Sequence, residues 1–173
     1  MKKDFILPIL SLTLICLFIT AALAVTNSFT APVIQKAAAE RAETARSAVI
    51  PEAAGFELMQ VEGLPDTVTE VYKTTNNVGY IFMLTTSGYG GEIKILCGID
   101  RDGIIIATNT LQQTETKGMG SKITEDAFAG QFPGKDSTLS GVDAISGATI
   151  SSRAYLDAIQ DVFAAYDIVK EVR

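Results

Sequence analysis

The sequence predicts an α+β domain, an antiparallel sheet with flanking helices, preceded by one N-terminal transmembrane helix and a stalk helix. Three observations lead to this fold class. A long run without charged residues stands near the N-terminus, a cluster of glycine-separated strands occupies the middle of the chain, and helical patterns follow the strands. Strands that come first and helices that come after are typical of α+β domains rather than of parallel βαβ folds.

The run from Phe5 to Val25 contains no charged residue. At about 1.5 Å per residue, a helix of this length crosses the roughly 30 Å hydrocarbon core of a bilayer. A cleaved signal peptide is the alternative, because Lys2 and Lys3 precede the run and Ala22-Leu23-Ala24 resembles a cleavage site. The apolar core of a signal peptide has only about 7 to 15 residues, so a retained anchor is favoured.

Three segments are expected: a transmembrane anchor over residues 1–30, a stalk helix over 31–50 and an extracytoplasmic domain over 51–173. The stalk shows small apolar residues at helical spacing and ends before a proline. These residues are Ile34, Ala38, Ala42, Ala45 and Val49. Lys2 and Lys3 lie close to the apolar run, whereas Lys36 lies far beyond it. Positive residues favour the inner side, which predicts a single-pass protein of the cell membrane with a cytoplasmic N-terminus.

The stretch from Val78 to Leu111 has the strongest strand pattern and predicts an antiparallel meander. In its middle strand, Ile93, Ile95, Cys97 and Ile99 alternate with less apolar residues, so Cys97 is expected in the core. Arg101-Asp102-Gly103 has the composition of a tight hairpin turn. An earlier strand is expected from Val68 to Lys73.

Two helices are expected after the sheet. Thr124 is predicted to cap a short helix in which Ile123 packs on Phe128. The last helix is predicted to begin near Ser151 or Ser152. Its apolar stripe should lie against the sheet. That stripe consists of Tyr155, Ile159, Val162, Tyr166 and Val169.

Charge and composition exclude several classes of function. Lys2, Lys3 and Asp4 precede the apolar run, which leaves 12 of the 14 basic and 19 of the 20 acidic residues after it, a balance of −7. Nucleic acid is therefore not an expected partner. The chain has two cysteines and no histidine, which excludes His-dependent triads and most zinc sites. We expect neither a catalytic residue nor a metal ligand.

Ser146-Gly147-Ala148-Thr149 stands directly ahead of the predicted last helix. Small residues let a ligand approach the backbone closely, and the start of a helix offers unpaired N–H groups and positive potential. The stretch therefore predicts either a bound phosphate or a phosphate ester on Thr149. A plain loop with a helix cap is the alternative.

Two other stretches are rich in glycine: 87–91, Ser-Gly-Tyr-Gly-Gly, and 115–120, Glu-Thr-Lys-Gly-Met-Gly. Together with Asp143-x-x-Ser-Gly-Ala-Thr behind one anchor, they resemble the G subunit of Rnf-type electron transport complexes. That family shares its FMN-binding domain with the C subunit of the sodium-pumping NADH:quinone reductase. The resemblance covers the anchor and the domain from about residue 60 onward.

The resemblance implies FMN as the cofactor, joined through its phosphate to Thr149 by a flavin transferase. The expected FMN-binding residues are Thr149, Ser146, Gly147, Ala148, Ser151, Ser152, Glu115, Thr116, Gly118, Met119 and Gly120. Two departures affect the surroundings of the flavin ring: Lys117 stands where the family often has proline, and no histidine precedes Glu115.

The resemblance further implies an electron-carrying subunit of a membrane-bound, ion-translocating ferredoxin:NAD⁺ oxidoreductase, which works with other membrane and peripheral subunits and is not an enzyme alone. Three alternatives remain. One is a flavinylated subunit of a sodium-pumping quinone reductase or of an extracellular electron-transfer system. Another is a membrane-anchored module that binds a phosphorylated ligand. A hydrolase with Ser146 or Thr149 as nucleophile is the weakest, because no base is evident.

Overall fold

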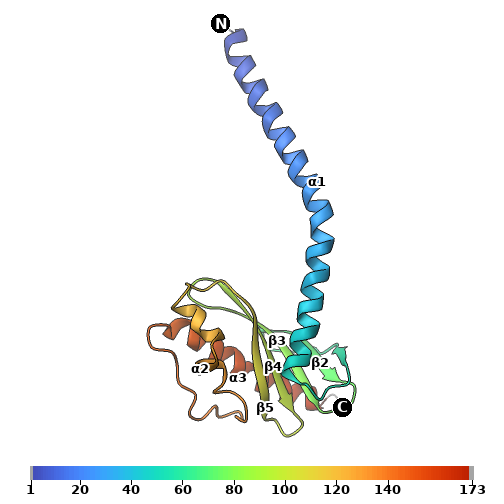
Figure 1. The fold of residues 1–173 in the computed structure, drawn as a ribbon, viewed down its shortest axis with the longest axis vertical. Helices are drawn as coiled ribbons and strands as arrows, with labels where there is room; N and C mark the ends of the chain where they lie inside the picture. Colours follow the sequence, from blue (N-terminus) through green and yellow to red (C-terminus); the bar gives the residue numbers. More distant parts are fainter. Residues whose placement is uncertain (1, 172–173) are drawn as a thin grey trace. The chain divides into compact units, whose positions relative to one another are not determined.

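The computed structural model describes residues 2–171, with side chains from Ile9 onward. Its described part forms two compact units, one that reaches Ala42 and one that begins at Glu43. The elements, shown in Figure 1, are α1 (Lys2–Val49), β1 (Phe56–Met59), β2 (Val68–Thr74), β3 (Gly79–Ser87), β4 (Glu92–Asp100), β5 (Ile105–Gln113), a 3₁₀ helix η1 (Gly120–Thr124), α2 (Asp126–Ala129) and α3 (Thr149–Glu171).

Helix α1 joins the predicted anchor and the predicted stalk without a break and ends at Val49, ahead of Pro51. Its most apolar window has a mean hydropathy of 2.5, so the helix is long and apolar enough to cross a membrane. Four hydroxyls within it are satisfied by the helix itself, which limits their cost in lipid. Thr13, Thr26, Ser28 and Thr30 each donate to a backbone carbonyl three or four residues earlier.

The sheet has the order β1-β2-β3-β4-β5, and all neighbours are antiparallel. This confirms the predicted meander and the strand predicted at Val68. The hairpin turn after β4 is also confirmed, because the Asp100 carboxylate accepts from the backbone N–H groups of Asp102 and Ile104, both at 2.9 Å. β1 was not predicted and forms the edge beside β2.

One face of the sheet packs against α2 and α3 and forms the main core. Ile93, Ile95, Cys97 and Ile99 are fully buried on this face, as predicted. All five residues of the stripe predicted for the last helix are buried against it. Burial raises the pKa of the Cys97 thiol far above its usual range, which makes Cys97 a packing residue rather than a reactive one.

The opposite face of the sheet is also partly covered, which the strand alternation did not predict. Val49, at the end of α1, and Ile50 pack with Ile81 and Leu96 in a second apolar cluster. Gly98 gives these residues room, because a Cβ there would lie 2.5 Å from Val49 Cγ1. The sheet is therefore sandwiched between α3 and the C-terminal end of α1.

Two predicted helix starts were wrong. Thr124 does not cap α2, because its hydroxyl donates back to the carbonyl of Ser121 at the end of η1, and Glu125 holds the N-cap position. Ile123 and Phe128 are nevertheless both in the core, as expected. The last helix begins at Thr149, two residues before Ser151, so Thr149 belongs to its first turn.

Candidate flavin site

The turn between β3 and β4 holds Tyr89 at its tip. Gly88 N–H donates to the Gly91 carbonyl at 2.8 Å, so Tyr89 and Gly90 are the two central residues of a tight turn. Side chains on either side of Tyr89 are sterically excluded. A Cβ on Gly88 would overlap Glu115 Oε1, and one on Gly90 would lie 2.6 Å from the Thr114 carbonyl oxygen.

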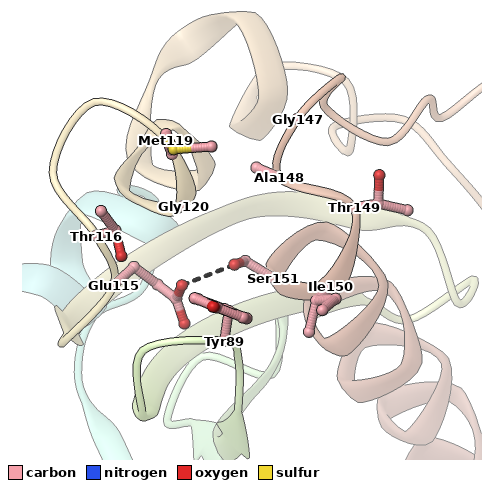
Figure 2. Close-up of a pocket in the computed structure, with 10 residues that line it drawn as sticks. All are labelled: Tyr89, Glu115, Thr116, Met119, Gly120, Gly147, Ala148, Thr149, Ile150 and Ser151. Carbon is pink, nitrogen blue, oxygen red and sulfur yellow. Dashed lines mark hydrogen bonds between the residues drawn. The ribbon is translucent and has the colours of Figure 1, made fainter.

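A buried carboxylate connects this turn to the two other glycine-rich stretches. Glu115 is only 8% exposed. Its Oε1 accepts from the backbone N–H of Gly90 at 3.1 Å, and its Oε2 accepts from the Ser151 hydroxyl at 2.7 Å. Gly120 passes so close that a Cβ would overlap Oε2. Figure 2 shows Glu115 reaching across to Ser151 in the first turn of α3.

A serine side chain of α3 holds the loop that precedes this helix. Ser152 Oγ donates to the Ala148 carbonyl at 2.9 Å and accepts from the Ile145 N–H at 3.0 Å. Gly147 has a φ of 81°, a conformation that glycine adopts without strain. This arrangement buries Ala148 and leaves Thr149 exposed at the helix start.

Thr149 begins α3 with an environment that favours an anion. The first N–H groups of a helix lack acceptors within it, and its dipole is positive there. No acidic residue lies in the first turn of α3. Arg153 is one turn further on and shares the helix face of Thr149 because of the i, i+4 spacing. The Thr149 side chain makes no hydrogen bond to any residue that the structure describes.

These elements enclose a cavity of about 470 Å³ (Figure 2). Its lining comes from the β3–β4 turn, the loop after β5 and the start of α3. The lining residues are Tyr89, Glu115, Thr116, Met119, Gly120, Gly147, Ala148, Thr149, Ile150 and Ser151. The volume lies within the range of roughly 300–1,000 Å³ that small-molecule sites occupy.

Eight of the eleven residues predicted for the site line this cavity, and three do not. Ser146 is exposed outside it, Gly118 lies in the loop with its N–H bonded to Ser121 Oγ, and Ser152 is buried beneath the helix start. Tyr89 and Ile150 line the cavity but were not among the predicted site residues. Tyr89 belonged to a glycine-rich stretch already singled out, whereas nothing in the sequence marked Ile150.

Among residues 2–171 the structure shows no group of three or more acidic or cysteine side chains placed to hold a metal ion. The cavity instead combines one free hydroxyl beside a helix start, one buried carboxylate and several apolar side chains. A ligand with an anionic end and a large aromatic part matches this combination.

A family model described as an FMN-binding domain matches residues 88–164, from the β3–β4 turn into α3, and this range contains all the residues that line the cavity. The chain is also similar over most of its length to curated proteins. It is 32% identical to the G subunit of the Na⁺-translocating ferredoxin:NAD⁺ oxidoreductase complex of Acetobacterium woodii, covering 91% of this chain and 87% of the relative. It is 34% identical to the G subunit of the ion-translocating oxidoreductase complex of Methanosarcina acetivorans, covering 91% and 92%.

A third relative, the G subunit of the proton-translocating ferredoxin:NAD⁺ oxidoreductase complex of Clostridium ljungdahlii, is 29% identical over 51% of this chain and 54% of its own. The chain belongs to the family of G subunits of Rnf-type ion-translocating oxidoreductase complexes. This confirms the resemblance seen in its motifs. The family is named for a complex of several subunits, and α1 is consistent with a membrane-anchored member.

The residues present fit FMN. The free Thr149 hydroxyl and the first turn of α3 suit its phosphate, and the apolar side chains Tyr89, Met119 and Ile150 suit its ring system. Glycine at positions 88, 90 and 120 leaves room for Glu115, because a Cβ at each of these positions would lie too close to Glu115 or to the backbone just before it.

Proposed function

We propose that this chain is an electron-carrying subunit of an ion-translocating ferredoxin:NAD⁺ oxidoreductase, with FMN joined covalently to Thr149. One observation carries the proposal: Thr149 presents an exposed, unbonded hydroxyl to the cavity from the first turn of α3. The two neighbouring serines differ, because Ser151 and Ser152 are buried and already hydrogen-bonded. Only a hydroxyl that faces solvent is open to a modifying enzyme.

Attachment requires an activated flavin phosphate, a phosphoanhydride, because an ester does not form spontaneously from free phosphate in water. In the proposed reaction, Thr149 Oγ1 forms a bond to the flavin phosphorus, the anhydride bond from that phosphorus breaks, and the remaining phosphate compound leaves. A base on the flavin transferase takes the hydroxyl proton. The start of α3 then stabilises the charge of the phosphodiester.

Bound FMN supplies reversible acceptance of one or two electrons at its ring, and the chain supplies position and electrostatics. Gly147, Ala148 and Thr149 would hold the phosphate end. Glu115, Thr116 and Met119 would lie toward the ring, with Gly120 behind Glu115. Gly118 and Ser152, which do not line the cavity, hold the shape of its loops through their hydrogen bonds. Ser146 is exposed outside the cavity.

The test compares two threonines of the same cavity. Thr116 also lines it, is exposed and makes no side-chain hydrogen bond to a described residue, but it lies in the loop after β5 and not at a helix start. The full chain is produced together with its flavin transferase, and flavin fluorescence is measured after denaturing electrophoresis. Thr149→Val should abolish the fluorescent band and Thr116→Val should keep it.

Intact-mass measurement should show one added FMN phosphoester in the unsubstituted chain and none in Thr149→Val. Flavin that is released by denaturation would instead indicate a module that binds a phosphorylated ligand without a covalent bond. Flavin that persists in Thr149→Val would place the ester elsewhere and overturn the assignment.

The chain is proposed to lie in the cell membrane as a single-pass protein, with its anchor over residues 1–30, its stalk over 31–50 and its FMN domain, 51–173, outside the cytoplasm. Two relatives at 32% and 34% identity are aligned over about nine tenths of this chain, which supports the Rnf-type assignment over a quinone reductase component. Co-purification of the other complex subunits with the full chain is the expected result. Recovery with quinone reductase subunits would contradict it.

A further inference from the structure

Exposed large apolar side chains are concentrated at the cavity, whereas nearly all other large apolar side chains of the described domain are wholly or partly buried. Within residues 43–171, four large hydrophobic side chains are exposed: Leu58 at 52%, Tyr89 at 73%, Met119 at 54% and Ile150 at 58%. Three of these four line the cavity. Exposed apolar side chains that converge on one concave site indicate a ligand or partner that covers them.

Tyr89 is the most exposed of the three, and hydrogen bonds hold the backbone on either side of it. The Gly88–Gly91 hydrogen bond closes its turn, and the Glu115 carboxylate holds the N–H of the next residue, Gly90. The same carboxylate binds Ser151, two residues after Thr149. The position of the Tyr89 backbone is thus tied to the helix start that carries the Thr149 hydroxyl.

The three exposed side chains come from three different elements. Tyr89 comes from the β3–β4 turn, Met119 from the loop after β5 and Ile150 from the first turn of α3. In Figure 2, Tyr89 and Met119 lie on opposite sides of the Glu115–Ser151 hydrogen bond, with Thr149 beside them. A flat aromatic group tethered at Thr149 can enter between two such walls. A protein surface would contact both walls only if it carried a protrusion that fits this concave site.

We propose that Tyr89 is a positioning residue whose phenol ring forms one wall of the isoalloxazine site, in contact with the ring of the FMN on Thr149. This inference rests on the proposed function. An aromatic wall would cover the ring, exclude water from one of its faces and be buried in return, which accounts for an otherwise costly exposed tyrosine on a rigid turn. The turn presents only this side chain, since its neighbours at 88, 90 and 91 are glycines.

The experiment uses the full flavinylated chain in detergent and separates attachment from ring contact. Flavin fluorescence of the denatured protein reports attachment. The ratio of native to denatured fluorescence and the quenching of native fluorescence by iodide report whether the ring is covered by a phenol. Contact with a phenol quenches flavin fluorescence, and a covering side chain keeps iodide away.

Tyr89→Leu should keep the denatured signal, raise the native signal several-fold and increase iodide quenching. Tyr89→Phe should keep the protection from iodide, because it retains an aromatic wall, while relieving part of the quenching by the phenol. Leu58→Ser is the matched control: it changes the fourth large hydrophobic side chain that is exposed within residues 43–171, one that does not line the cavity, and should alter neither ratio.

Unchanged native fluorescence and iodide quenching in flavinylated Tyr89→Leu would overturn the proposal and indicate that Tyr89 meets a partner protein instead. If Tyr89→Leu is not flavinylated, Tyr89→Phe decides: a ring open to iodide in that variant overturns the proposal, and a protected ring supports it. Absence of denatured fluorescence in the unsubstituted chain is the separate result that would contradict the proposed function.

Discussion

At the scale of single residues, Glu115 connects parts of the site that lie far apart along the chain. Its hydrogen-bond partners Gly90 and Ser151 lie 25 and 36 residues away along the chain. A buried carboxylate is costly unless its oxygens receive donors, and here one donor comes from the 87–91 stretch and the other from the first turn of α3, two residues after Thr149. One side chain therefore holds the three motifs together.

Replacing this carboxylate is expected to loosen the site. Glu115→Ala leaves the Ser151 hydroxyl and the Gly90 N–H without their partner and should lower the free energy of unfolding by about 1–3 kcal/mol. Glu115→Gln, which keeps the size and two hydrogen-bonding atoms, should lose less. Denaturant titration of the full chain measures both. The exposed Glu62→Ala should change little, and equal stability of Glu115→Ala and Glu62→Ala would show that the bridge is unimportant.

Tyr155 gives a prediction on pH. Burial raises its pKa to about 12, and the nearby hydroxyls of Thr108 and Thr110 oppose part of that rise. An unfolded tyrosine titrates near 10, so between pH 10 and about 12 the unfolded state loses its proton first. Stability from this residue is fully present below pH 10 and should fall by up to about 2–3 kcal/mol as pH rises to about 12.

Tyr155→Phe should remove that part of the alkaline loss, measured as the pH dependence of the denaturation midpoint. Tyr89→Phe, which changes an exposed tyrosine, should keep the loss. The idea fails if both variants lose stability with pH as steeply as the unsubstituted chain.

At the scale of elements, the packing of α1 on the outer face of the sheet depends on Gly98. A Cβ at this position would lie 2.5 Å from Val49 Cγ1 and 3.1 Å from Ile50 Cγ1. Gly98→Ala should therefore push the end of α1 away from β4 and cost about 1–3 kcal/mol of unfolding free energy.

The matched test is a double-mutant cycle. Val49→Ala alone leaves a gap and destabilises the chain, but combined with Gly98→Ala it provides room for the new methyl group. The loss of unfolding free energy in the double variant should be smaller than the sum of the two single losses. The difference should exceed the roughly 0.5 kcal/mol within which independent sites are additive. Simple additivity would show that the two residues do not meet.

Elements with dense, regular patterns were predictable from the sequence. β3, β4 and β5 are rich in apolar and β-branched residues and are separated by turns that contain glycine, and the buried stripe of α3 repeats at helical spacing. β1 was missed because four residues, Phe56–Met59, are too few for a period to emerge. The cap at Thr124 was wrong because a local 3₁₀ bond to Ser121 competes for its hydroxyl.

At the scale of the whole molecule, the site could be predicted only as separate motifs. The resemblance pointed to Thr149 and to the 115–120 loop, and the cavity contains residues of both. That Glu115 joins them to the Tyr89 turn depends on the sheet register, which brings residues 88–91 beside the end of β5. Ile150 lines the cavity from the first turn of α3, which starts two residues earlier than the capping pattern suggested.

The orientation of the chain in the membrane gives the last prediction. Lys2 and Lys3 lie next to the apolar part of α1 and no basic residue follows that part until Lys36, so the domain should be exported.

Ser137 is exposed on the domain surface, whereas Cys97 is fully buried and Cys16 lies in the apolar part of α1. Ser137→Cys should therefore react with a membrane-impermeant maleimide in intact cells, freed of any outer envelope. Lys3→Cys should react only after the membrane is opened, and the unsubstituted chain should react in neither case. The reverse pattern would place the FMN domain in the cytoplasm, where a covalent tether is not needed to keep a flavin from being diluted away.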